Sequence, residues 1–168
     1  MVNVLVKINN KDYEGKPFYN QDRAQALEDS HSDNYRPLFM PELADQRINS
    51  DENSVFWENW FTTPSIRATG KTNQGNKVVV YSHKPNFLSV PNNIREAKKQ
   101  GLINYAAKLP QDEFQKYVNE DGQTDDKGNR LVWVVSYEKL RKSTSEVIPV
   151  SAALDHPQTI PFLGGEER

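Results

Sequence analysis

His83 is the residue whose type and position best suit chemistry in this sequence. It ends the apolar run Lys77–Ser82, and residues just past a strand often carry function. Tyr81 falls on the same face of that run, and Arg67 lies on the run expected to pair with it. Together they would supply one titrating group and one cation for acid or base catalysis on an anionic substrate. The alternative, which we favour, is a partly buried strand-end histidine with Arg67 paired to a surface carboxylate.

Two tryptophans, Trp57 and Trp60, lie in the densest aromatic cluster of the chain, Val55–Phe61. Exposed, they would anchor a partner, because aromatic side chains dominate interface hot spots. A spacing of three equally suits one face of a helix turned into the core. We favour the core interpretation for at least one of them. Both stay candidate binding residues, together with Tyr81 and Lys71.

The run Ala68–Thr72 reads Ala-Thr-Gly-Lys-Thr, like the end of a phosphate-binding loop. The full motif needs a glycine where Ser65 stands, followed by a helix whose N-terminus holds the phosphate. A turn and a strand are expected to follow instead. The sequence therefore favours a hairpin turn, with Lys71 kept as a candidate for holding a small anion.

Patterns for metals and for a serine nucleophile fail on spacing. The loop Asp121–Arg130 is rich in oxygen ligands, but the place where a calcium loop needs Glu is Val132. The histidines at 31, 83 and 156 lack the spacing that puts two imidazoles together, and no Gly-x-Ser-x-Gly motif is present. We therefore predict no metal and no cofactor.

The composition is that of a globular chain on the polar side. Of 168 residues, 36% are hydrophobic and 26% are charged, which allows one core without disulfides. There is no cysteine, which excludes thiolate metal sites and cysteine nucleophiles and fits a reducing compartment. No stretch approaches the ~20 apolar residues of a membrane helix, and no signal peptide is evident at Met1–Ile8. We expect a cytoplasmic protein without membrane contact.

The net charge of −2 is unevenly distributed. Met1–Trp60 carries 6 basic and 11 acidic residues, whereas Phe61–Val118 carries 9 basic and 3 acidic ones. A basic middle segment suits phosphate groups. Weak nucleic-acid binding through 61–118 ranks third among the possible functions, because the lysines form no run and the whole chain is acidic.

Alternation of apolar residues predicts an α+β fold with one small mixed or antiparallel sheet. Strands are expected near 2–8, 65–70, 77–83 and 131–136. The segments at 65–70 and 77–83 should form a hairpin across a polar turn. The runs around Val79 and Trp133 are apolar on both faces and predict two inner strands.

Three to four short helices are expected to pack on this sheet. Residues 30–54 contain two prolines and few periodic apolar positions, which predicts a long and mobile loop. We expect one domain over 1–168. Two of the predicted helices have clear end signals: 21–29 with Asn20 as cap, and 93–100 with Asn93 as cap and Gly101 as stop. Two more helices are predicted at 110–119 and 137–142. An extended segment at 147–150 and a short helix after Ser151 are expected to follow.

Because every catalytic motif fails, the sequence favours a non-catalytic protein-binding or regulatory module. The alternative is a small enzyme acting on a phosphate- or carboxylate-bearing substrate through His83 and Arg67. The expected partner is another protein, with a small anionic ligand as a second option. The sequence gives no prediction of oligomeric state.

Overall fold

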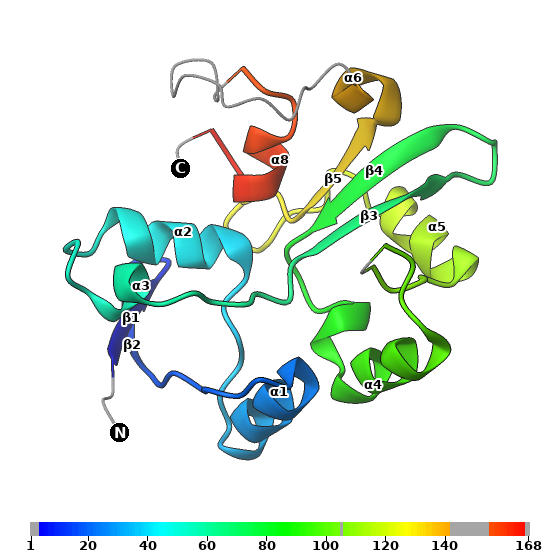
Figure 1. Ribbon diagram of the computed structural model, residues 1–168. Helices are drawn as coiled ribbons and strands as arrows, with labels where there is room; N and C mark the ends of the chain where they lie inside the picture. Colours follow the sequence, from blue (N-terminus) through cyan, green and yellow to red (C-terminus); the bar gives the residue numbers. More distant parts are fainter. Residues whose placement is uncertain (1–3, 105, 142–154, 167–168) are drawn as a thin grey trace. The chain divides into compact units, whose positions relative to one another are not determined.

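The computed structural model describes residues 4–104, 106–141 and 155–166 (Figure 1). The chain forms two compact units, each built from two separate stretches of sequence. Unit 1 takes the residues up to Pro64 together with Phe87–Lys108, and unit 2 takes Ser65–Asn86 together with the residues from Leu109 onward. That 1–168 acts as one domain stays a prediction.

Unit 1 begins with a β-hairpin. β1 (Val4–Ile8) pairs antiparallel with β2 (Lys11–Gly15). Asn9 and Asn10 join them, both with positive φ, a conformation that asparagine tolerates and a tight hairpin turn requires. The predicted strand near 2–8 is confirmed over its described residues. This hairpin, however, forms a sheet of its own.

Two helices of unit 1 lie side by side, α1 (Arg23–Ser32) and α4 (Pro91–Gln100) (Figure 1). Ala24 and Leu27 of α1 pack against Ile94 of α4 in a buried cluster. The short 3-10 helix η1 (Phe87–Ser89) precedes α4. Both predicted helices are confirmed.

The caps of these helices differ from the prediction. Asp22, and not Asn20, caps α1, because its carboxylate accepts the N–H groups of Ala24 and Gln25. α4 begins at Pro91, whose fixed φ suits the first helical position. Asn93 therefore lies inside the first turn of α4, and the predicted capping role is wrong.

Residues 30–54 are the largest correction to the sequence analysis. The predicted loop contains α2 (Met40–Ile48), which is followed by the short helix α3 (Val55–Glu58). Pro41 stands in the first turn of α2, where its missing N–H removes no helical bond. Leu43 of α2 packs with Val6 of β1 and Phe56 of α3. Contacts with distant segments thus order a stretch whose own pattern is weak.

Unit 2 is built on a three-stranded antiparallel sheet. Its order is β3 (Ile66–Lys71), β4 (Lys77–Ser82) and β5 (Val132–Ser136). β4 is central and almost wholly buried, as predicted for the run around Val79. β5 lies at the sheet edge in the described part of the chain and is only half-buried, so its prediction as an inner strand is wrong.

The helices of unit 2 cover this sheet. They are α5 (Gln111–Asn119), α6 (Tyr137–Arg141) and α8 (Thr159–Leu163) (Figure 1). Leu140 of α6 packs on Val79 and Tyr81. The predicted helices at 110–119 and 137–142 are confirmed, whereas α8 was not predicted. The predictions for 147–150 and for a helix after Ser151 lie outside the described residues.

The predicted α+β class is confirmed, with two small antiparallel sheets where one was expected. None of the helices over the described ranges combines the length and the apolar character that a bilayer crossing needs.

Candidate functional site

His83 is buried in unit 2 with both ring nitrogens engaged. Its exposed fraction is 4%. Nε2 lies 2.7 Å from the carbonyl oxygen of Pro161, and Nδ1 lies 2.9 Å from Oγ of Ser65. Because a carbonyl only accepts, Nε2 carries the proton and Nδ1 accepts from the serine hydroxyl. The ring therefore ties the end of β4 to α8, and its catalytic role stays a prediction.

Arg67 and Tyr81 are brought together by the sheet. They are directly opposite in the β3–β4 register, and Nε of Arg67 donates to Oη of Tyr81 at 3.2 Å. The Tyr81 hydroxyl in turn donates to Oε1 of Gln158 at 2.9 Å. Arg67 thus contacts a tyrosine where a surface carboxylate was expected. Tyr81 is almost fully buried, and its hydroxyl is hydrogen-bonded to both Arg67 and Gln158.

The Gly-Lys-Thr run builds a hairpin end. Gly70 is covered by the ring of Phe114, since a Cβ there would lie 2.8 Å from Cζ. The carbonyl of exposed Lys71 accepts from Nε2 of Gln111 at 2.9 Å. The chain then turns back into β4 through a hydrogen bond from the Thr72 N–H to the Asn76 carbonyl. The hairpin interpretation is confirmed.

The acidic loop of unit 2 is organised by its own hydrogen bonds. Asp125 accepts from the N–H groups of Lys127 and Asn129 and from the side-chain amide of Asn129. Burial raises the pKa of Asp125, but these hydrogen bonds outweigh it and leave that pKa below its usual value. No group of three His, Cys, Asp or Glu side chains suited to a metal occurs within the described ranges.

Trp57 and Trp60 lie on the surface of unit 1. Trp60 is 100% exposed and Trp57 is 51% exposed, whereas their neighbour Phe56 is buried. The core interpretation of the two tryptophans is therefore wrong. Because α3 is a single turn that buries only Phe56, the next aromatic residues are left facing solvent.

Arg47 of α2 holds this aromatic segment in place. Its Nε donates to the carbonyl of Phe56 at 2.9 Å, and its Nη2 donates to the carbonyl of Asn59 at 3.3 Å. Its guanidinium lies 5.4 Å from the ring centre of Trp57, and Nε1 of that indole donates to the Arg47 carbonyl at 3.0 Å. The sequence analysis missed Arg47, because it did not predict the helix that carries it.

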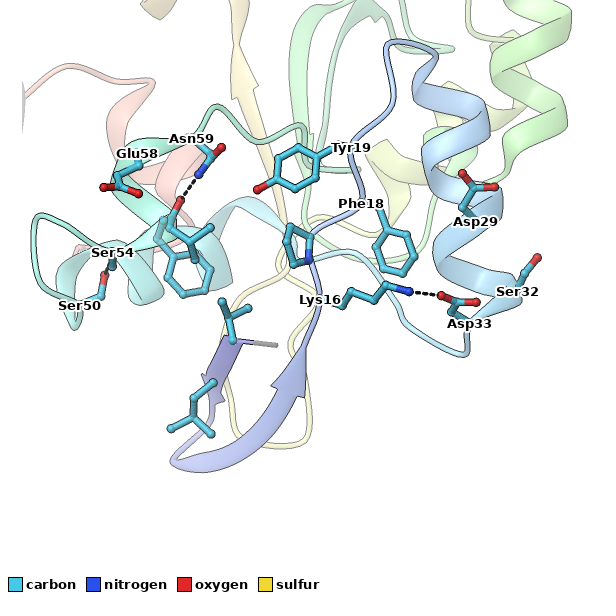
Figure 2. A pocket seen from close by; sticks show the side chains of 15 residues that line it. Lys16, Phe18, Tyr19, Asp29, Ser32, Asp33, Ser50, Ser54, Glu58 and Asn59 are labelled. Atoms are coloured by element: carbon cyan, nitrogen blue, oxygen red, sulfur yellow. Dashed lines mark hydrogen bonds and ion pairs between the residues drawn. The ribbon is translucent and has the colours of Figure 1, made fainter. Parts of the chain in front are cut away.

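A pocket of about 1060 Å³ lies beside this segment (Figure 2). One wall comes from α1 and the other from α3 and the loop before it. Lys16, Phe18 and Tyr19, from the segment after β2, lie between the walls in Figure 2. The sequence analysis proposed none of these residues. The lining residues are Val4, Leu5, Lys16, Pro17, Phe18, Tyr19, Asp29, Ser32, Asp33, Ser50, Ser54, Val55, Phe56, Glu58 and Asn59.

Exposed apolar side chains concentrate on unit 1. Of the ten large hydrophobic residues that are exposed in the described part of the chain, nine belong to unit 1, and only Phe162 belongs to unit 2. The nine are Leu5, Tyr13, Tyr19, Ile48, Trp57, Trp60, Val90, Leu102 and Ile103.

Comparison with known proteins gives one informative match. No protein-family model and no curated protein matches this sequence. The chain is similar to a solved structure described as "Accommodation of massive sequence variation in Nanoarchaeota by the C-type lectin fold", with a TM-score of 0.79 and 52% sequence identity. The match covers 90% of this chain and 68% of that one. The chain therefore belongs to the family of C-type lectin fold proteins that this nanoarchaeal structure represents.

Proposed function

We propose that this chain is a non-catalytic module that binds another protein through the exposed tryptophans of unit 1, Trp57 and Trp60, with Trp60 as the anchor. The observation that carries the proposal is the complete exposure of Trp60. A fully solvated indole contributes little to the fold, whereas a tryptophan buried in an interface is among the strongest anchors known.

The backbone beside Trp60 is held in place before any partner binds. Arg47 accounts for two of the contacts, to the carbonyls of Phe56 and Asn59. The side chain of Asn59 adds a third, to the carbonyl of Val55 at 3.1 Å. A segment that is already ordered loses less conformational entropy on association. This arrangement favours recognition by a preformed surface.

Membership of the C-type lectin fold family is consistent with a binding module. The related structure is described as accommodating massive sequence variation. A scaffold that keeps its fold while its side chains change suits recognition better than catalysis, which needs fixed chemical groups. By the same reasoning, we propose recognition and not catalysis as the role of this chain.

The enzymatic alternative has less support. His83 is buried with both ring nitrogens hydrogen-bonded, whereas a general acid or base must reach the substrate's proton. Arg67 and Lys71 are exposed and keep a small anionic ligand as a second option. The cytoplasmic location expected from the composition belongs to the proposal, and nucleic acid is not among the partners proposed.

Binding to native partners tests the proposal. The immobilised chain, its Trp60→Ala variant and its Trp57→Ala variant are each exposed to a lysate of the source organism, and retained proteins are quantified by mass spectrometry. We expect Trp60→Ala to lower retention of a specific partner by about tenfold or more, as for an interface hot spot. Trp57, half-covered by Arg47, should have a smaller effect.

Tyr13→Ala is the matched control, since Tyr13 is an aromatic residue of the same unit that is 49% exposed. It should leave the retained proteins within about twofold of the unaltered chain, as expected for a residue outside the hot spot. A set of retained proteins that is identical for all four chains would rule out the aromatic anchor.

A further inference from the structure

The pocket of unit 1 is lined by more acidic than basic side chains. Asp29 and Asp33 stand on the α1 wall, and Glu58 stands on the α3 wall, against one basic residue, Lys16 (Figure 2). Apolar residues of β1, α3 and the segment after β2 supply most of the rest of the lining, together with Ser32, Ser50, Ser54 and Asn59. The combination suits a ligand with an apolar body and a positive charge.

The lining already shows how it holds a cation. The Lys16 ammonium forms an ion pair with Asp33 (Figure 2) and lies 4.9 Å from the ring centre of Phe18. An aromatic face and a carboxylate together are the recurrent pair that recognises ammonium and guanidinium groups.

The lining also contains another aromatic residue, Tyr19, and two further carboxylates, Asp29 and Glu58, which lie on opposite walls (Figure 2). Tyr19 has 72% of its surface exposed. None of the ion pairs recorded over the described ranges involves Asp29 or Glu58. The carboxylate of Asp29 accepts one hydrogen bond, from Nε2 of Gln25 to Oδ1, which leaves Oδ2 for a ligand.

We infer that this pocket takes a lysine or arginine side chain from an extended segment of the partner protein; the inference rests on the proposed protein-binding function. Charge complementarity selects the cation, because three carboxylates and one ammonium group line the pocket, and this local excess of negative charge attracts a positive segment. The pocket volume of about 1060 Å³ slightly exceeds the usual range of small-ligand sites, about 300–1,000 Å³, so the pocket can hold a basic side chain together with parts of its neighbours. Leu5 and Tyr19, both largely exposed, offer apolar contacts to the residues that flank the basic one.

Short synthetic peptides test this inference on the ¹⁵N-labelled chain. The probe is acetyl-Leu-Arg-Leu-amide, and its control carries citrulline, which is isosteric with arginine but neutral. We expect the arginine peptide to shift the backbone amides of Tyr19, Glu58 and Asn59 in NMR spectra. The citrulline peptide should bind about tenfold more weakly, because it cannot form the charge-assisted hydrogen bonds.

Two charge-neutralising variants locate the interaction. Glu58→Gln and Asp29→Asn keep the shape of each side chain and should each weaken the arginine peptide about threefold to tenfold. Glu52→Gln is the matched control, because it removes the same charge from an exposed side chain that does not line the pocket. It should leave the affinity unchanged.

Several results would overturn the inference. One is equal affinity for the citrulline peptide, and another is a set of shifts that maps outside the pocket. A third is the absence of any shift up to about 5 mM peptide, a concentration that still detects the weakest specific contacts. The last is equal weakening of peptide binding by Glu52→Gln. Equal binding of free arginine amide would show that the site takes small amines and would refute the commitment to a protein segment.

The two proposals fail separately. If the peptides do not bind but Trp60→Ala still releases the native partner, the pocket inference falls and the proposed function stands. If the arginine peptide binds in the pocket but Trp60→Ala changes no retained protein, the pocket stands as a cation site and the aromatic anchor falls.

Discussion

At the scale of single residues, Gly70 shows how packing explains a residue that a motif would assign to chemistry. It stands in a Gly-Lys-Thr run, yet its hydrogen atoms face the ring of Phe114, which approaches to 2.8 Å of the place a Cβ would take. That separation is below van der Waals contact, so the ring is seated on the strand because no side chain intervenes. The glycine serves the contact between β3 and α5.

Gly70→Ala should therefore destabilise the protein by about 1–3 kcal/mol, the usual range for overpacking a core site. Urea denaturation followed by circular dichroism measures the change. Thr69→Ala, on an exposed neighbour in the same strand, is the control and should cost less than about 1 kcal/mol. A Gly70→Ala protein as stable as the original chain would show that the ring moves away without loss.

Residue types alone identified which side chains could do chemistry, but not which of them meet solvent. His83 was predicted to follow the strand that carries Tyr81, and β4 does end at Ser82, because alternation along a strand is a local property. Their burial depends on α6 and α8, which come more than fifty residues later in the chain. The core interpretation of the tryptophans rested on the helical spacing between Trp57 and Trp60, whereas α3 ends two residues before Trp60.

At the scale of elements, α2 is ordered by a contact that its own sequence does not announce. Gln46 of α2 is 5% exposed. Its Oε1 accepts from the N–H of Lys7 at 2.9 Å, and its Nε2 donates to the carbonyl of the same residue at 2.5 Å. The side chain thus completes the outer edge of β1 as a neighbouring strand would. A partner 39 residues away cannot be read from local periodicity.

Removing this amide should destabilise unit 1. In Gln46→Ala both backbone groups of exposed Lys7 lose their partner, and each lost hydrogen bond should cost about 0.5–1.5 kcal/mol. The free energy of unfolding in urea gives the measured value. Ile48→Ala, on an exposed side of the same helix, should stay within about 0.5 kcal/mol of the original chain. If the two variants are equally stable, the contact with Lys7 does not hold α2.

The strands were predicted better than the helices and loops around them. Four of the five described strands, all except β2, were predicted from alternation and turn residues, which are local signals. The position of each strand within a sheet is not local. Leu131–Val135 is apolar on both faces and was taken for an inner strand. Among the described strands, however, β5 lies at an edge, where Arg130 covers Trp133 with its guanidinium 4.1 Å from the ring centre.

At the scale of the whole molecule, ion pairs join parts of unit 1 that are far apart in sequence. Asp22 pairs with Lys98, and Glu28 pairs with Arg95, between α1 and α4. The hydrogen bond from Lys98, followed by those from the N–H groups of Gln25 and Ala24, lowers the pKa of Asp22. The hydrogen bond from Arg95, helped by its charge, lowers the pKa of Glu28.

These pairs predict a loss of stability in acid. Each carboxylate has a lower pKa in the folded than in the unfolded chain, so its contribution is complete above the unfolded values of 3.8 and 4.5. As the pH falls from these unfolded values through the lower folded pKa, the stabilisation that each carboxylate contributes is lost. Urea midpoints measured from pH 7 to about pH 3 should therefore decrease on the acid side.

Glu28→Gln tests the origin of that decrease, because it removes one of the two titrating groups and keeps the side-chain shape. Its midpoint should vary less with pH than that of the original chain, and high salt should reduce the difference because both pairs are exposed. Glu52→Gln removes an acid outside these pairs and should show the original dependence. Parallel curves for all three proteins would assign the acid sensitivity to other groups.

The pocket of unit 1 was out of reach of sequence analysis for the same reason. Its lining comes from β1, the segment after β2, α1, α3 and the loop before α3, and no two of these share a motif. The acidic excess of the first sixty residues was visible, but which carboxylates share one cavity depends on how the elements pack. That excess gave no prediction of a cationic partner, since the anionic ligand predicted from the sequence rests on His83, Arg67 and Lys71, which belong to unit 2.

The alternation of the two units along the chain has a consequence for synthesis. Unit 1 possesses all of its residues once Lys108 has left the ribosome, whereas unit 2 then has only the β3–β4 hairpin and still lacks β5 and its helices. The nascent chain can therefore close α1 onto α4 first, with the hairpin carried as a long insertion between them. Until Val132–Ser136 emerges, the apolar β4 keeps one unpaired edge, and this is the interval in which a chaperone would have most to protect.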